Sequence, residues 1–204
     1  MAEAPRPLGA ALAALGAPRK VAAIRSVRSS ASCAGPRGPY STLIESERGD
    51  RLRFSQHWPD GRSFIAQIDG QQAWSVDEQS GERELLTAEA RAGVRTHEFQ
   101  LLPIVLAERY SDLAAAGTAD LGGIECDAFD AVDELGLACR LYFDRATSLL
   151  RGLDVTNYYE PDDRVAVRLD DWRPVAGVLF AWRAVASDRL GDWVFEFEEV
   201  APSS

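Results

Sequence analysis

Residues 170–185 read DDWRPVAGVLFAWRAV, two runs of strand-forming residues on either side of a turn signal. The signal is Pro174–Gly177, in which proline presets φ and glycine tolerates positive φ. We therefore predict a β-hairpin whose inward face carries Val178, Phe180 and Trp182. Such a hairpin could seal a filled core or form one wall of a cavity, and these residues alone leave both open.

Similar strand-like runs continue in both directions from this hairpin. Tight turns are predicted at Gly49–Asp50, Pro59–Gly61, Asp69–Gly70 and Leu135–Gly136. Strands joined by such short turns must be antiparallel. We count about ten of them, and residues 192–200 alternate cleanly between apolar and acidic side chains.

Two segments have helical periodicity instead. Leucines at 8, 12 and 15 begin an apolar face, which predicts two short helices or one kinked helix over residues 8–27. Residues 87–116 form a second helical segment between two strand-rich halves, 28–86 and 117–200. The order of elements predicts a single domain over residues 1–204. Its fold class is α+β, a strongly curved antiparallel sheet covered by helices.

Composition excludes several classes of function. The chain has 22 basic and 32 acidic residues, a net charge of −10, and lacks the positive field that nucleic-acid binding requires. No apolar run is long enough to span a membrane. Residues 1–20 lack the net positive start of a signal peptide, because Glu3 offsets Arg6. We expect a monomer, soluble as given or already processed.

The sequence offers no arrangement of catalytic or metal-binding residues. Its two histidines, His57 and His97, are expected to be solvated, and they are too few for a zinc site. Cys126 and Cys139 lie on successive predicted strands, out of register for a disulfide. No nucleotide-binding or nucleophile motif occurs. We therefore expect no cofactor and no catalytic residues, although an enzyme remains possible if distant residues converge.

Several stretches, taken in order, resemble one family. They are LAALGAPRKVAAIRSVRSSAS (12–32), IDGQQAWSVDEQSGERELLT (68–87), GIECDAFDAV (123–132), CRLYFDRATSLLRGL (139–153) and LDDWRPVAGVLFAWRAV (169–185). This set is similar to the outer-membrane lipoprotein-sorting proteins of the LolA-like superfamily. The chain departs from their pattern in lacking a signal peptide and in having FAW (180–182) where a proline-containing stretch is common.

The resemblance implies a half-open β-barrel closed by helices, with an apolar interior. It also implies a non-enzymatic protein of the bacterial envelope or periplasm, with lipid or lipoprotein acyl chains as its partners. The candidate cavity residues are the inward apolar and aromatic side chains: Phe54, Phe64, Trp74, Phe99, Leu102, Leu106, Phe143, Phe180, Trp182, Trp193 and Phe195. The alternative is an accessory domain with a filled core, which would bind an envelope protein and no lipid.

Within this picture the helical segment 87–116 is expected to act as a lid across the open side of the barrel. Its apolar stripe would face buried surface: Phe99, Leu102, Leu106 and Tyr110. Its polar positions would face water: Arg95, Glu98, Glu108 and Arg109. Pro103 predicts a bend, and Gly93 and Gly117 are the expected hinges.

Overall fold

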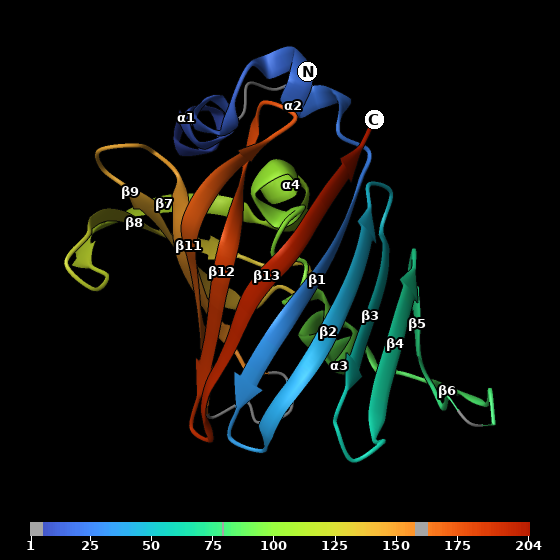
Figure 1. Ribbon diagram of the computed structural model, residues 1–204. Coiled ribbons are helices and arrows are strands. Elements are labelled where there is room, and N and C mark those ends of the chain that lie inside the picture. Colours follow the sequence, from blue (N-terminus) through green and yellow to red (C-terminus); the bar gives the residue numbers. More distant parts are fainter. Residues whose placement is uncertain (1–5, 79, 158–162) are drawn as a thin grey trace.

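A computed structural model of the chain describes residues 6–78, 80–157 and 163–204 (Figure 1). The helices are α1 (Arg6–Leu15), α2 (Pro18–Ala23), α3 (Ala88–Arg95) and α4 (Leu102–Arg109). The strands are β1 (Ser26–Gly35), β2 (Gly38–Glu47), β3 (Arg51–His57), β4 (Ser63–Asp69), β5 (Gln72–Val76), β6 (Arg83–Leu85), β7 (Ser111–Asp120), β8 (Glu125–Val132), β9 (Ala138–Asp144), β10 (Leu150–Thr156), β11 (Arg164–Val175), β12 (Val178–Asp188) and β13 (Gly191–Ser203).

The strands of the described residues form one antiparallel sheet of 13 strands. Each half of the chain runs as a meander, β1 to β6 and β7 to β13. The last strand, β13, pairs with β1 from Ser26↔Ser203 to Ala34↔Val194 and so joins the two halves. The sheet curves but does not close, and β6 and β7 remain its two edges (Figure 1).

The hairpin predicted at residues 170–185 is present as β11 and β12. Its two turn residues, Ala176 and Gly177, both have positive φ, 53° and 82°, as a tight turn between twisted strands requires. Val178 and Phe180 are almost fully buried, as the alternation predicted. Trp182 is only half-buried and lies under the guanidinium of Arg173, 5.0 Å from the ring centroid.

The N-terminal helices lie across the tip of this hairpin (Figure 1). Of the two readings for residues 8–27, two short helices are present, and β1 begins at Ser26. The break falls at Gly16, which forms a bridge with Val178 of the hairpin. A Cβ at Gly16 would meet the carbonyl oxygen of Gly177 at 2.6 Å, so this close approach requires glycine.

The second helical segment differs from the prediction. Residues 111–116 belong to β7 and not to a helix, because pairing with β8 outweighs the helical preference of the alanine-rich stretch. Pro103 lies in the first turn of α4, and the helix is kinked two residues later at Val105, where φ is −109° and ψ is 16°, so the predicted bend is present. Gly93 lies within α3 and Gly117 within β7, so neither is a hinge at the end of a helical segment.

The same segment is more deeply buried than was expected of a lid. All nine residues from Glu98 to Leu106 are buried. A segment buried along its whole length is packed as part of a core. Figure 1 shows α4 inside the curve of the sheet, between β11–β13 and β7–β9. We call Glu98–Leu106 the plug.

Three of the four polar residues expected to face water are buried instead. Arg95 and Glu98 are 6% and 0% exposed, and the side chain of Arg109 is 9% exposed. These residues pair with charged side chains from other elements, and those partners take the place of water around the buried charges. Glu108 is exposed, as predicted. Among the described residues, no helix combines the length and the apolar character needed to cross a bilayer.

Candidate functional site

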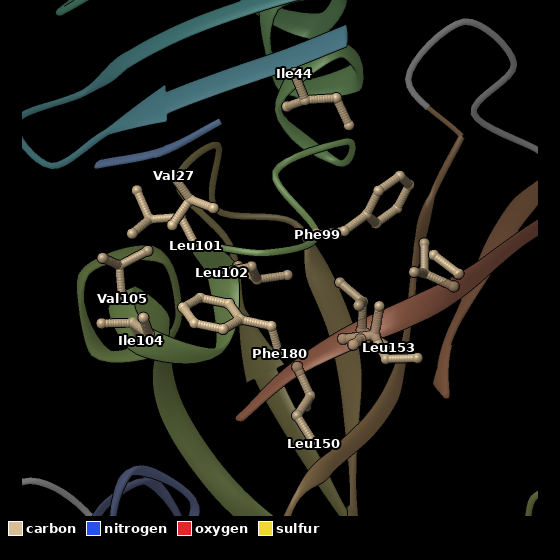
Figure 2. Packing of buried hydrophobic residues seen from close by; sticks show 14 of the residues in the cluster. Val27, Ile44, Phe99, Leu101, Leu102, Ile104, Val105, Leu150, Leu153 and Phe180 are labelled. Carbon is tan, nitrogen blue, oxygen red and sulfur yellow. The ribbon is translucent and has the colours of Figure 1, made fainter. Parts of the chain in front are cut away.

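Most of the side chains nominated for a cavity meet in one cluster, but that cluster is filled. Seven of them are almost fully buried: Phe54, Phe99, Leu102, Leu106, Phe143, Phe180 and Phe195. Figure 2 shows Phe180 directed towards α4, close to Leu102 and Ile104, with Leu150 on its other side. The plug therefore occupies the space that the curved sheet encloses.

Aromatic rings complete the filling next to the plug. The Phe99 ring lies 4.9 Å from that of Phe195 and 6.2 Å from that of Phe197, measured between centroids. The Phe54 ring lies 4.1 Å from the imidazole of His97. Contacts of this length are those of packed aromatic pairs.

The remaining nominated residues lie at the margin of the core or outside it. Phe64, Trp182 and Trp193 are half-buried and pack against its edge. Trp74 is on the outer face of the sheet, where its indole donates to Gln67 at 2.9 Å. Its neighbour Ala73 takes the inward position, and strand alternation then sends the tryptophan outward.

The outer face near Trp74 has a depression of about 720 Å³ lined by residues of β1 to β5. Its charged side chains already pair with one another, as Arg28 does with Glu45 at 3.5 Å and Arg51 with Asp69 at 3.3 Å. A surface that neutralises itself in this way offers no unmatched group for a ligand.

A different pocket is both apolar and open. It lies where α1, α2 and α4 meet and has a volume of about 390 Å³. We call it the helical groove, and its lining residues are Gly9, Leu12, Ala13, Pro18, Val21, Ala22, Arg48, Ile104, Val105, Ala107 and Glu108. The only charged pair in this set, Arg48 and Glu108, is 3.8 Å apart.

The groove exists because α1 presents two different faces. Leu8, Ala11 and Leu15 are buried against the core. Gly9 and Ala13, which lie between them in the sequence, are exposed and too small to fill the space beside α4. Sequence reasoning missed this site because no single segment contains it. The small residues of α1 and α2 were the available signal.

A cluster of charges, some buried and some partly exposed, anchors the helical segment to the sheet. We call it the ion cluster, and it consists of Asp50, Arg91, Arg95, Glu98, Arg109 and Glu134. From α3, Arg91 and Arg95 each reach Asp50 at 2.7 Å. They also reach Glu134, at 3.3 and 3.0 Å. The β2–β3 and β8–β9 turns thus hold α3 from two sides.

The same cluster ties the start of the plug to the end of α4. Glu98 is fully buried and accepts hydrogen bonds from Nε and Nη2 of Arg109, at 3.1 and 3.3 Å. Burial raises the pKa of Glu98, and the charge and hydrogen bonds of Arg109 partly offset that rise. Removing one partner of such a buried pair leaves the other charge uncompensated.

His97 is in the interior, so the expectation that it is solvated was wrong. Its ring packs between Phe54 and Phe99, and Nδ1 lies 3.2 Å from the carbonyl oxygen of Val94. Burial lowers the pKa of His97 to about 4. His57, in contrast, is partly exposed and lies 3.5 Å from Glu78.

The cysteines form no disulfide. In the β8–β9 hairpin Cys126 lies opposite Asp144 and Cys139 opposite Ala131, which confirms that the two are out of register. Burial raises the pKa of Cys33 to about 11 and that of Cys139 to about 12, so both remain protonated thiols. Among the described residues, no group of three or more potential metal ligands gathers.

Comparison with known proteins connects this architecture to solved structures. No family model matches the sequence, and a search of curated proteins finds no match. A LolA superfamily protein from Nitrosomonas europaea matches 100% of this chain and 95% of its own, with a TM-score of 0.66 and 10% identity. A DUF1329 family protein from Desulfovibrio piger matches 97% and 92%, with a TM-score of 0.62 and 12% identity.

A third structure carries the functional name nearest to the sequence prediction. It is a putative outer membrane lipoprotein-sorting protein domain from Vibrio parahaemolyticus, with 96% of this chain and 93% of its own covered, a TM-score of 0.58 and 9% identity. At such low identity the likeness concerns the fold alone. The curved, open antiparallel sheet with helices against it is therefore a LolA-like fold, as the sequence motifs predicted.

Proposed function

We propose that this chain is a non-enzymatic binding protein for the acyl chains of a lipid or lipoprotein, and that the helical groove is its binding site. The observation that carries the proposal is the groove itself, an open pocket of about 390 Å³ whose lining is apolar except at one ion pair. Pockets of this size and character are typical of small-molecule sites. The LolA-like fold and its lipoprotein-sorting relative support the same class of ligand.

The free energy of burying apolar groups favours an acyl chain over a polar ligand. Each buried CH₂ group contributes about 0.8 kcal/mol to binding. Leu12, Val21 and Ile104 would supply the apolar walls. Arg48 and Glu108 would hold the polar end of the ligand where the chain leaves the groove.

We place the ligand in the groove and not among the aromatic side chains nominated from the sequence. Those side chains are in contact with the plug, so a chain could reach them only if α4 moved away. The groove requires no such movement. A cell-envelope or periplasmic location is part of the proposal, since the lipoprotein-sorting relative points there.

The test is ligand recovery combined with a matched pair of variants. Native mass spectrometry of the purified protein should find a bound lipid, and a fluorescent fatty acid should bind. Ala13→Trp should abolish this binding, because Ala13 lines the groove. Ala10→Trp, the same change at an exposed position of α1 outside the groove lining, should not. No bound lipid, no uptake, or equal effects of both variants would refute the proposal.

The alternative is an accessory domain that binds a protein and no lipid, and the filled interior favours it. The plug leaves the sheet with a packed core, which a scaffold needs and a carrier with an internal cavity would lack. This alternative predicts that neither native mass spectrometry nor the fatty-acid assay detects a ligand. The same experiment therefore separates the two functions.

A further inference from the structure

Charge is distributed very unevenly along this acidic chain. Residues 1–44 contain six of the 22 basic residues and one of the 32 acidic residues. Their net charge is +5, against −15 for residues 45–204, which together make the total of −10. The segment includes α1, α2, all of β1 and most of β2; α1, α2 and the beginning of β1 lie together at one end of the molecule, and Arg37 lies at the β1–β2 turn (Figure 1).

Three of these basic residues lie on or next to α2, the short helix that also lines the helical groove. Arg19 and Lys20 lie on α2, and Arg25 lies between α2 and β1; all three are exposed. Within the described part of the chain, none of the three has an ion-pair partner, whereas Arg28 and Arg48 do. We call Arg19, Lys20 and Arg25 the basic triad.

Small apolar residues are exposed next to the triad. Pro18, Ala22 and Ala23 are exposed on the same short helix, and Pro18 and Ala22 also line the groove. Cations next to an apolar opening complement a bilayer surface, where anionic headgroups cover acyl chains. The excess of negative charge on the rest of the molecule would be repelled from such a surface and would turn this end towards it.

We propose that the α1–α2 end docks on an anionic lipid bilayer through the basic triad, with the helical groove open towards the membrane. An acyl chain could then pass between bilayer and groove without crossing water. The proposal deepens the proposed function and rests on it for its biological purpose. Docking itself requires no ligand in the groove and can be measured separately.

The experiment is vesicle flotation with the full chain. The vesicles are phosphatidylcholine alone, or phosphatidylcholine mixed with phosphatidylglycerol. We expect binding only to the anionic vesicles and its loss at high salt, because salt screens exposed charges. In the variant Arg19→Gln/Lys20→Gln/Arg25→Gln, binding should weaken by about fivefold per residue, about 100-fold in all.

A matched control removes the same charge elsewhere. Arg37→Gln/Arg83→Gln/Arg164→Gln changes three exposed basic residues at the β1–β2 turn, on β6 and at the start of β11. This variant should float as the unchanged protein does, and circular dichroism should show that both triple variants fold. Equal binding to neutral vesicles, no binding to either vesicle, or equal losses in the two variants would overturn the proposal.

Failure of docking and failure of the proposed function give different results. If docking alone is wrong, the protein still binds fluorescent fatty acid from solution but does not float with anionic vesicles. If the groove does not bind acyl chains, the protein floats but takes up no fatty acid. Ala13→Trp should reproduce the second pattern, because it fills the groove and leaves the basic triad unchanged.

Discussion

Two apolar regions of the molecule share α4. The interior of the curved sheet is filled with side chains, whereas the helical groove is open. On the interior side, Leu102 and Leu106 are buried, and Leu102 lies close to the ring of Phe180 (Figure 2). On the groove side, Ala107 lines the pocket together with the small residues Gly9 and Ala13. Apolar composition alone therefore does not make a cavity. The size of the side chains that meet in a region determines whether it is filled or open.

The largest expected effect is a loss of stability from substitutions in the filled interior of the sheet. Phe180→Ala or Phe195→Ala should each lower the free energy of unfolding by about 3–5 kcal/mol, because each leaves a void in a packed core. Urea denaturation measures it. The control is Trp74→Ala on the outer face, for which we expect a loss of about 1 kcal/mol. Similar losses at all three sites would mean that the interior is not specifically packed.

The ion cluster should matter almost as much, because it holds the plug in place. Glu98→Gln removes the buried partner of Arg109 and should cost about 3 kcal/mol of unfolding free energy. Glu108→Gln, on the groove side, breaks an exposed pair with Arg48 and should cost less than about 1 kcal/mol. If both variants lower the free energy of unfolding by the same amount, the interior and the groove side do not differ in the way we propose.

Acid should weaken the filled interior through His97. The pKa of His97 is lowered from 6.5 to about 4 in the folded chain, so the unfolded state binds more protons between these values. The contribution to stability is fully present above pH 6.5 and is lost as the pH falls towards 4, up to about 3 kcal/mol.

Unfolding free energies measured at intervals across that range check the prediction. His97→Gln should reduce the slope of stability against pH in this window. The other histidine supplies the control, since His57→Gln leaves His97 in place and should keep the slope. An unchanged slope in His97→Gln would show that this ring does not titrate as its packing implies.

The smallest effect is expected in the groove. Ala13→Trp should change the free energy of unfolding by less than about 0.5 kcal/mol, because the indole enters space that is already open. Thermal denaturation beside Ala10→Trp measures it. A loss of about 1–3 kcal/mol for Ala13→Trp alone would indicate overpacking and would show that the groove is closed.

Local signals in the sequence were sufficient for the hairpins, because a turn such as Ala176–Gly177 depends on its own residues. They were insufficient for β7, whose alanines prefer a helix until β8 pairs with them. The burial of Arg95 and Glu98 was unpredictable for a related reason. Their partners come from α4 and from turns distant in the sequence.

The candidate site was the least predictable part of the molecule. The aromatic residues nominated for it were mostly inward-facing, as strand alternation indicated, but alternation says nothing about what fills the space they enclose. The groove depends on three helices meeting, and its signal was small side chains such as Gly9 and Ala13. Small residues usually indicate close packing, so they did not suggest a pocket.

Hydrogen exchange compares the plug and the groove in one experiment, with and without fatty acid. We predict that amides 98–106 exchange as slowly as those of β1 and β13, and that fatty acid does not change their exchange rates. Amides of α1 and α2 should become slower when fatty acid is added. Fast exchange at 98–106 that fatty acid suppresses would contradict the account, because the plug would then be a lid and the ligand would lie inside the sheet.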